Sequence, residues 1–302
     1  MEKITIQTRG LSYKISKQTI IDDLNLEVEQ GSIYGFLGPN GAGKTTTIKL
    51  LLNLLIPPQN TVFLFGKEMN QHRIENLKRI GSLVEQPSLY GHLSGYENLL
   101  NRCMLLNIPK IRAFEVLNLV GLKEAADKKA ENYSLGMKQR LGIGLSLLTD
   151  PDLLLLDEPT NGLDPTGIVE IRNLMIKLVS DFKKTILISS HLLSEIEKTA
   201  THVGIINKGK LIYQGKIKHL QDMYKPHLMI ELSQAKAAIQ FLNLMDYTAD
   251  LVSEQQIRLD FKSADETARI NTLLVAEGFN IHGIYQEKKD LENSFLNLTT
   301  SN

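Results

Sequence analysis

The residues best suited to chemistry lie in the segment GPNGAGKTTT at positions 38–47. It fits the pattern G-x-x-x-x-G-K-[ST], in which glycines let the backbone curl until several N–H groups point at a polyphosphate. Lys44 would then reach the β- and γ-phosphates, and Thr45 would offer its hydroxyl to Mg²⁺. The segment predicts a site for a Mg²⁺-bound nucleoside triphosphate, with these residues in contact with the nucleotide: Gly38, Pro39, Asn40, Gly41, Ala42, Gly43, Lys44, Thr45 and Thr46.

Two acidic side chains come at the end of the apolar run in LLLLDEP, residues 153–159. Such a run is typical of a buried parallel strand, and the carboxyl ends of parallel strands meet at one edge of a sheet, where ligands bind. We expect Asp157 to hold Mg²⁺ through water and Glu158 to point at the γ-phosphate. His191 follows a second apolar run, TILISS, so we expect it at the same edge.

The apolar patterns around these residues predict the elements that position them. IYGFL is expected as the strand before the loop, and the helix after the loop is expected to end at Pro57-Pro58, because proline lacks the N–H that a helix needs. Further strands are expected over residues 3–11, 20–28, 62–66, 81–84 and 203–215, the first two joined by the polar turn KISKQ and the last forming a hairpin. Strands alternating with helices predict an α/β domain.

A long helical stretch interrupts this domain. Residues 94–149 read almost entirely as helix and predict a helical insertion at about residues 86–150. Within it, a polar Ser-Leu-Gly at residues 134–136 opens the amphipathic helix of NYSLGMKQRLGIGLSLL. Beyond the insertion, Asp164 followed by Pro165 predicts a helix N-cap with proline at the first helical position.

Length and composition limit the classes of function. The chain has 302 residues, enough for about two domains. Lys plus Arg and Asp plus Glu are 34 each, so no excess of positive charge points to nucleic acid as a partner. The single cysteine, Cys103, cannot form an internal disulfide, which suits a reducing cytosol. No signal-peptide pattern occurs, and no run approaches the ~18 apolar residues of a membrane span. We therefore expect a cytoplasmic chain that meets a membrane only through a partner.

The nucleotide-binding domain is expected over residues 1–220, and a small accessory α+β domain over residues 221–302. The second segment alternates the strand patterns HLMIEL, QIRLDF and FNIHGIY with the helical patterns SQAKAAIQFLNLM, DETARINTLLVAEG and LENSFLNLT. It contains no nucleotide, metal or nucleophile signature, so the sequence leaves its role open.

The loop, SLGMKQ, LLLLDEP, NGLD and His191 occur in one order, and this set resembles the ATP-binding cassette (ABC) ATPases over residues 1 to about 220. More closely, IYGFLGPNGAGKTTTIKLLLNLL, VEQPSLY, SLGMKQRLGI and DEPTNGLDP resemble the cytoplasmic ATPases of bacitracin-export and lantibiotic-protection transporters, as does SFLNLT near the end of the chain. The resemblance implies a P-loop ABC ATPase fold of the α/β class. A mixed sheet core would carry an antiparallel β subdomain and the helical insertion, followed by the C-terminal α+β domain.

The resemblance also implies the partners and the remaining site residues. Two copies would form a head-to-tail dimer around two ATP molecules, each held between the loop of one copy and Ser134 and Gly136 of the other. A helix N-terminus is a natural anion site, which agrees with this arrangement. Asp164 would lie at the nucleotide and transmit closure. Glu158 would be the base that orients the attacking water, with Lys44 and His191 completing the catalytic set.

An integral membrane permease would be the second partner, driven through the helical insertion. The chain would then lie peripherally on the inner face of the bacterial cell membrane. The predicted function is that of the ATPase subunit of a bacterial exporter that protects against a peptide antibiotic such as bacitracin or a lantibiotic. We expect the permease, rather than this chain, to select the transported substrate.

Two positions depart from the usual family pattern. Where the family often stacks adenine on an aromatic ring, counting back from Gly38 gives Ile15, with Tyr13 nearby, so adenine contact is assigned to this pair. At the strand end VEQP, Glu85 replaces the usual glutamine. An ionised glutamate only accepts hydrogen bonds and adds negative charge, so we expect Glu85 beside Mg²⁺, with a catalytic or coupling part. Lantibiotic-protection ATPases resemble this chain in having an acid there.

Three other functions compete with this interpretation. One is an exporter ATPase for another substrate. The second is a soluble ABC ATPase acting on DNA or ribosomes, which is disfavoured because the interval between Gly38 and Ser134 leaves no room for a long coiled coil. The third is a nucleotide-binding regulator without turnover, which is disfavoured because Lys44, Asp157 and Glu158 are all present.

Overall fold

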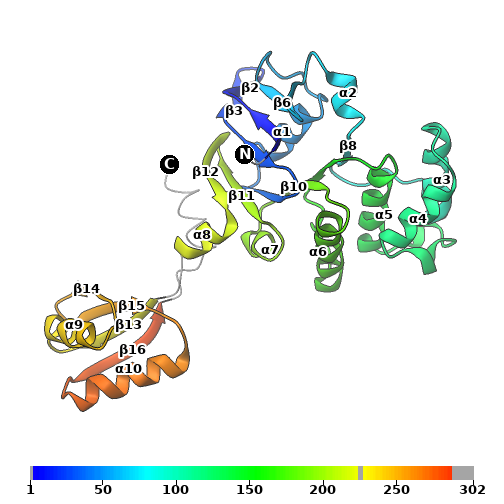
Figure 1. The fold of residues 1–302 in the computed structure, drawn as a ribbon. Coiled ribbons are helices and arrows are strands. Elements are labelled where there is room, and N and C mark those ends of the chain that lie inside the picture. Colours follow the sequence, from blue (N-terminus) through cyan, green and yellow to red (C-terminus); the bar gives the residue numbers. More distant parts are fainter. Residues whose placement is uncertain (1–2, 224–226, 288–302) are drawn as a thin grey trace. The chain divides into compact units, whose positions relative to one another are not determined.

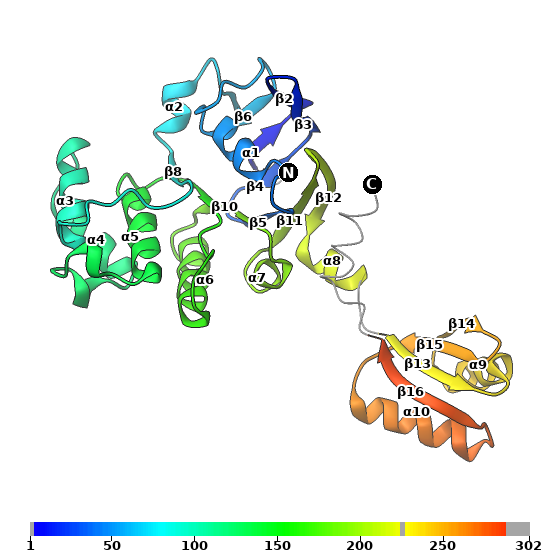
Figure 2. The same ribbon diagram turned by 180° about the vertical axis from the view of Figure 1, so that it is seen from behind.

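The computed structural model describes residues 3–223 and 227–287. The chain forms two compact units, Met1–Ile217 and Lys218–Asn302. Both are visible in Figures 1 and 2, which view the chain from opposite sides. Among the described residues, no helix is both long and apolar enough to cross a bilayer. The predicted helix of LENSFLNLT, which includes the family-like SFLNLT, lies outside the described residues.

A six-stranded mixed sheet forms the centre of the first unit, in the order β12-β11-β5-β10-β9-β8. All neighbours are parallel except the β11–β12 hairpin. The central strands are buried along their whole length, as expected for a sheet covered on both faces. The strands are β5 (Ile33–Leu37), β8 (Ile80–Leu83), β9 (Leu153–Asp157), β10 (Thr185–Ser190), β11 (His202–Asn207) and β12 (Lys210–Lys216).

An antiparallel region accompanies this sheet, as predicted, but its strands are divided differently. The predicted strand over residues 3–11 breaks at Gly10, whose φ of +55° is a left-handed conformation that ends a strand. The result is a four-stranded sheet in the order β4-β1-β6-β7 and a separate β2–β3 hairpin. The strands are β1 (Ile4–Thr8), β2 (Leu11–Ile15), β3 (Gln18–Leu24), β4 (Glu27–Glu29), β6 (Val62–Leu64) and β7 (Lys67–Glu68).

The helical insertion gathers beside the β8 edge of the central sheet (Figure 1). Helix α5 packs closely against the neighbouring segments of this region, because glycines on its surface leave room for them. A Cβ on Gly142 would come within 2.8 Å of Pro87, and one on Gly144 within 3.1 Å of Val116. The elements are α3 (Gly95–Leu105), α4 (Ile111–Leu119), the 3₁₀ turns η1 (Lys123–Ala125) and η2 (Ala130–Asn132), and α5 (Leu135–Leu147).

Four further helices of the first unit connect its strands: α1 (Lys44–Leu51), α2 (Arg73–Leu77), α6 (Pro165–Ser180) and α7 (Leu193–Glu197). Helix α1 was expected to reach Pro57-Pro58, and this was wrong. It ends at Leu51 because Asn53 takes a left-handed backbone with φ of +53°, a common way to end a helix. A short α8 (Ile217–Met223) follows β12.

The second unit is a split βαβ arrangement, built in the order β13-α9-β14-β15-α10-β16. Its antiparallel sheet has the order β14-β15-β13-β16. Strand β14 has no counterpart among the predicted strands, because ADLVS is short and mostly exposed. The elements are β13 (His227–Leu232), α9 (Ala235–Leu244), β14 (Ala249–Ser253), β15 (Gln256–Asp260), α10 (Ala264–Ala276) and β16 (Ile281–Glu287).

Candidate nucleotide site

Three parallel neighbours end at the same edge of the central sheet, and the predicted site residues follow them. Strand β10 lies between β5 and β9, with Ser189 in register with Asp157 and Ser190 in register with Leu37. The loop begins directly after β5, the two acids come at the end of β9, and His191 follows β10. The register therefore brings segments that are more than a hundred positions apart in sequence to one edge.

The loop after β5 leads directly into the N-terminus of α1. Gly43 is the N-cap, and its φ of +111° is accessible to glycine at little cost. A Cβ there would also come within 2.6 Å of Ile21. No side chain within the described residues caps α1, so its first amides are free to bind an anion. The geometry fits a polyphosphate resting on this helix end.

Lys44 is only 6% exposed and lies under the loop. Its Nζ donates to the carbonyl oxygens of Gly38 at 2.7 Å and Pro39 at 3.3 Å. The same ammonium is 3.1 Å from Glu158 Oε1. The other oxygen of Glu158, Oε2, is 2.7 Å from His191 Nδ1. The structure thus brings three of the four predicted catalytic side chains into one connected group, and the fourth, Glu85, pairs with Lys49 instead.

A second polar group holds the candidate metal ligands together. Thr45 donates its hydroxyl to Asp157 Oδ2 at 2.8 Å, and Ser189 donates to Asp157 Oδ1 at 2.6 Å. Asp157 is 4% exposed, so both bonds are made in a nearly dry environment. Mg²⁺ is usually bound by one or two carboxylates together with substrate phosphates and water. A hydroxyl and a carboxylate facing one spot beside the loop fit that requirement.

Ser189 is a site residue that the sequence did not reveal. Its Oγ accepts from the backbone N–H of Glu158 at 2.8 Å while its hydroxyl donates to Asp157, so it fixes both acids. This matters because Glu158 has a φ of +48°, a conformation that a glutamate adopts only when its surroundings hold it there. The one available signal was a polar residue directly after the apolar residues Ile-Leu-Ile of TILISS.

The predicted second half of the site lies at the start of two helices. Ser134 caps α5, since its side chain accepts from the N–H of Met137 at 3.2 Å. Asp164 caps α6 in the same way, accepting from the N–H of Gly167 at 3.1 Å. A Cβ on Gly136 would lie 3.7 Å from Gly167 Cα, so the two helix starts are in contact. Within the described residues, Ser134, Gly136 and Asp164 contact each other's helix starts and make no hydrogen bond to the loop of the same chain.

Glu85 lies just past β8 and has a different partner from the one expected. Its Oε1 is 2.9 Å from Lys49 Nζ on α1, and its side chain is 67% exposed. The hydrogen bond and charge of Lys49 lower the pKa of Glu85, so the carboxylate is ionised at neutral pH. Lys49 is four positions after Thr45 and shares its face of α1. A role for Glu85 at Mg²⁺ therefore remains a prediction.

The two candidate adenine contacts differ in exposure. Tyr13 is partly buried and packs against the hydrophobic core of the first unit. Ile15 is 50% exposed at the end of β2. The assignment of adenine contact to this pair stays a prediction.

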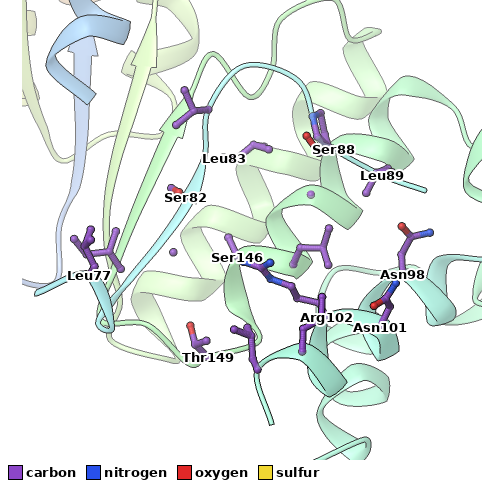
Figure 3. A pocket seen from close by; sticks show the side chains of 18 of the residues that line it. Leu77, Ser82, Leu83, Ser88, Leu89, Asn98, Asn101, Arg102, Ser146 and Thr149 are labelled. Atoms are coloured by element: carbon purple, nitrogen blue, oxygen red, sulfur yellow. The ribbon is translucent and has the colours of Figure 1, made fainter. Parts of the chain in front are cut away.

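A separate cleft of about 980 Å³ opens between the β8 edge of the sheet and the helical insertion. Figure 3 shows Leu83, Leu89, Arg102 and Ser146 around it. Its charged lining residues are Arg73, Lys78 and Arg102, with no carboxylate among the described lining side chains. The segment after Glu85 runs along the cleft, since Gln86 and Pro87 line it. The segment whose Glu85 pairs with Lys49 of α1 thus continues directly into the lining of the cleft.

Comparisons with known proteins agree with this site. The sequence profile described as "ABC transporter" matches residues 21–161. The bacitracin transport ATP-binding protein BcrA of Bacillus licheniformis is 42% identical over 298 residues, covering 97% of this chain and 96% of the relative. The lantibiotic transport ATP-binding protein SrtF of Streptococcus pyogenes is 38% identical over 233 residues, covering 75% of this chain and 98% of the relative.

Among solved structures, cbiO1 from Clostridium perfringens, described as part of the ABC transporter complex cbiONQ, is similar with a TM-score of 0.68 and 25% identity. The match covers 80% of this chain and 96% of that one. The fold class and the resemblance inferred from the motifs are therefore confirmed. The chain belongs to the ABC transporter family, as one of its ATP-binding, ATP-hydrolysing subunits.

Proposed function

We propose that this protein is the ATPase subunit of a bacterial exporter that protects the cell against a peptide antibiotic of the bacitracin or lantibiotic kind. The observation that carries the proposal is the identity of 42% with BcrA over 97% of this chain, which includes the second unit. SrtF, by contrast, leaves about a quarter of this chain without a counterpart, since it covers 75%. A bacitracin-type substrate is therefore favoured over a lantibiotic.

Two copies would enclose two ATP molecules. The loop of one copy, residues 38–46, would hold the phosphates, and Thr45 and Asp157 would hold Mg²⁺, which neutralises the phosphate charge. Ser134 and Gly136 of the other copy would face the γ-phosphate with the N-terminus of α5. Asp164 caps α6, whose start contacts the start of α5. It would transmit the closing of the dimer around ATP from one copy to the other.

Before hydrolysis, the Glu158 carboxylate would exchange its contact with Lys44 for one with the attacking water. Lys44 and His191 both contact its carboxylate, at 3.1 Å and 2.7 Å. A γ-phosphate binding Lys44 competes with that ion pair and frees one carboxylate oxygen to accept a hydrogen bond from the attacking water. His191 would then contact the γ-phosphate. Glu158 is the base in this scheme, and no other acid among the described residues contacts both Lys44 and His191.

The second proposed partner is an integral membrane permease, which would hold the chain at the inner face of the bacterial cell membrane. The cleft beside the helical insertion is the proposed contact, because it is largely apolar and its charged residues are cations. Exposed apolar side chains around it support this, with Ile74 at 71% and Leu105 at 69% exposure. An apolar permease segment with acidic ends would complement this surface.

One experiment tests the function as a whole. The chain and a candidate multi-span permease are expressed together in an antibiotic-sensitive bacterium, and the inhibitory concentrations of bacitracin, a lantibiotic and an unrelated antibiotic are measured. We expect the largest rise in inhibitory concentration for bacitracin. We expect no rise for any of the antibiotics when Lys44→Ala replaces the parent. Unchanged sensitivity to every peptide antibiotic, despite ATP hydrolysis by the complex, would refute the assigned substrate class.

A prediction arises at the cleft. Leu105→Asp should reduce the membrane-bound fraction about tenfold or more, because it places a charge where an apolar contact is made at the proposed interface. ATP hydrolysis by the purified chain should stay near that of the parent, since Leu105 is 69% exposed. Leu54→Asp is the matched control, because Leu54 is 64% exposed and does not line the cleft. Equal membrane binding by the two variants would remove the cleft as the docking site.

A further prediction concerns Glu85. Glu85→Gln and Glu85→Ala should both hydrolyse ATP within about fivefold of the parent, because an exposed ion pair contributes little. Glu85→Ala should lose antibiotic protection, whereas Glu85→Gln should keep part of it, since an amide can still bind metal or water. Both activities are measured on the same variants. Full protection by Glu85→Ala would remove the coupling role, and hydrolysis as slow as that of Glu158→Gln would assign Glu85 to the chemistry instead.

A further inference from the structure

Arg140, near the start of α5, connects three helices through one partly buried guanidinium. The side chain is only 13% exposed. Its Nη1 donates to the carbonyl oxygens of Val120 at 3.2 Å and Gly121 at 3.0 Å. Its Nη2 is 3.3 Å from Glu170 Oε2 on α6. The Nε–H finds no acceptor among the described residues, so the two Nη groups set the position of the side chain.

The first of these contacts ties α5 to the end of α4. Val120 is the C-cap of α4, where unpaired carbonyl oxygens carry partial negative charge. A guanidinium satisfies two of these carbonyls at once because its N–H groups form a fixed planar fork. The fit is close, since a Cβ on Gly121 would lie 3.1 Å from Nη1. Rotation of α5 relative to α4 would break both hydrogen bonds.

The second contact ties α5 to α6 and has a companion at the helix starts. One turn before Arg140, Gly136 lies against Gly167, with a built Cβ only 3.7 Å from Gly167 Cα. The N–H of Gly167 is the group that Asp164 caps. Helices α5 and α6 are therefore joined at two successive levels, by a backbone contact and by the Arg140–Glu170 ion pair.

We propose that Arg140 is a positioning residue, which locks the helix start bearing Ser134 and Gly136 to the helix start bearing Asp164. Each chain then presents both to its partner's nucleotide as one preformed surface. The inference rests on the proposed ATP-enclosing dimer. Within the described residues, the Arg140 guanidinium contacts Val120, Gly121 and Glu170 and no group of its own chain's loop, so we expect its effect on the site of the other copy.

The experiment compares full-length variants in a Glu158→Gln background by sedimentation with and without Mg²⁺-ATP. Arg140→Met should weaken ATP-dependent dimerisation about tenfold or more, because it removes every contact of the guanidinium. Glu170→Gln removes only the partly exposed ion pair, so it should weaken ATP-dependent dimerisation by at most about fivefold. Arg140→Lys should recover part of the loss. Glu75→Gln, which breaks the exposed Lys67–Glu75 pair elsewhere in the unit, is the matched control and should dimerise as the parent does.

A second measurement separates positioning from general damage. ATP binding to the monomer is measured at low protein concentration, where the chain's own loop acts alone, and Arg140→Met should bind as the parent does. Arg140→Met is then mixed with Lys44→Ala. A mixed dimer would contain one intact site, made of the loop of Arg140→Met and the helix start bearing Ser134 and Gly136 of Lys44→Ala, so ATP-dependent association should return.

The outcomes are distinct. If the parent fails to dimerise with ATP, the proposed dimer is wrong and the role of Arg140 is wrong with it. If the parent dimerises and Arg140→Met dimerises equally well, the inference alone is wrong. Loss of ATP binding in monomeric Arg140→Met, or no association in the mixture, would assign the residue to the folding of its own chain and overturn the inference.

Discussion

Glu158→Gln should slow ATP hydrolysis about 10²- to 10⁴-fold, which corresponds to ~3 to 5 kcal/mol of activation barrier. The amide has nearly the same shape as the carboxylate, but it cannot take a proton from the attacking water. Its oxygen can still accept from Lys44, which lies 3.1 Å from Oε1 of the carboxylate, and its NH₂ can donate to an unprotonated Nδ1 of His191, which lies 2.7 Å from Oε2. The structure of the site should therefore survive the substitution. Phosphate release under single-turnover conditions, with Mg²⁺ present, measures the effect.

ATP binding should be retained or improved in this variant. The ion pair between Glu158 and Lys44 competes with the γ-phosphate for the ammonium, and an uncharged amide competes less. Glu195→Gln is the matched control, because Glu195 is also a half-buried acid near the site, but its carboxylate accepts a hydrogen bond from Thr160 instead. It should hydrolyse ATP at close to the parent rate. Hydrolysis by Glu158→Gln at that same rate would mean that another group activates the water.

The sequence could predict the centre of this site because each of its residues stands in a short pattern that can be recognised without knowing the fold. The loop pattern, the acids after LLLL and the histidine after TILISS each stand at a strand end, and strand ends of a parallel sheet converge without knowledge of the exact order. The polar start of α5 and the Asp-Pro start of α6 are likewise recognisable within a few residues. Both helices begin as predicted, with Ser134 and Asp164 as their caps.

The residues that the sequence did not reveal depend on contacts between distant segments. Ser189 matters only because β10 pairs with β9 in a register that places it opposite Asp157. Lys49 and Arg140 are ordinary basic residues of helices until the fold brings Glu85 and Glu170 to them. Strand β14 was missed for a related reason, since it is stabilised by pairing with β15 and not by an apolar pattern of its own.

Gly136→Asp should abolish the ATP-dependent dimer, because it places a carboxylate where the partner's γ-phosphate must approach the start of α5. Two unit charges about 4 Å apart near a protein surface repel by ~4 kcal/mol, which is roughly a thousandfold in the dimerisation constant. The Cβ of the new side chain should fit in the monomer. A Cβ on Gly136 would meet its nearest neighbours at 3.7 Å and 3.9 Å, which are ordinary van der Waals distances. Sedimentation of Gly136→Asp in the Glu158→Gln background, with and without Mg²⁺-ATP, measures the loss.

Gly136→Ala separates charge from size in this test. The methyl group occupies the same Cβ position beside Gly167 but carries no charge, so this variant should dimerise far better than Gly136→Asp. Raising the salt concentration should bring the dimerisation constants of the two variants closer together, since screening weakens repulsion between charges that remain in contact with water. Equal loss in both variants would indicate that the helix start meets the partner by close packing alone. An ATP-independent dimer that tolerates Gly136→Asp would exclude the enclosed-nucleotide arrangement, because no phosphate would then lie at this helix start.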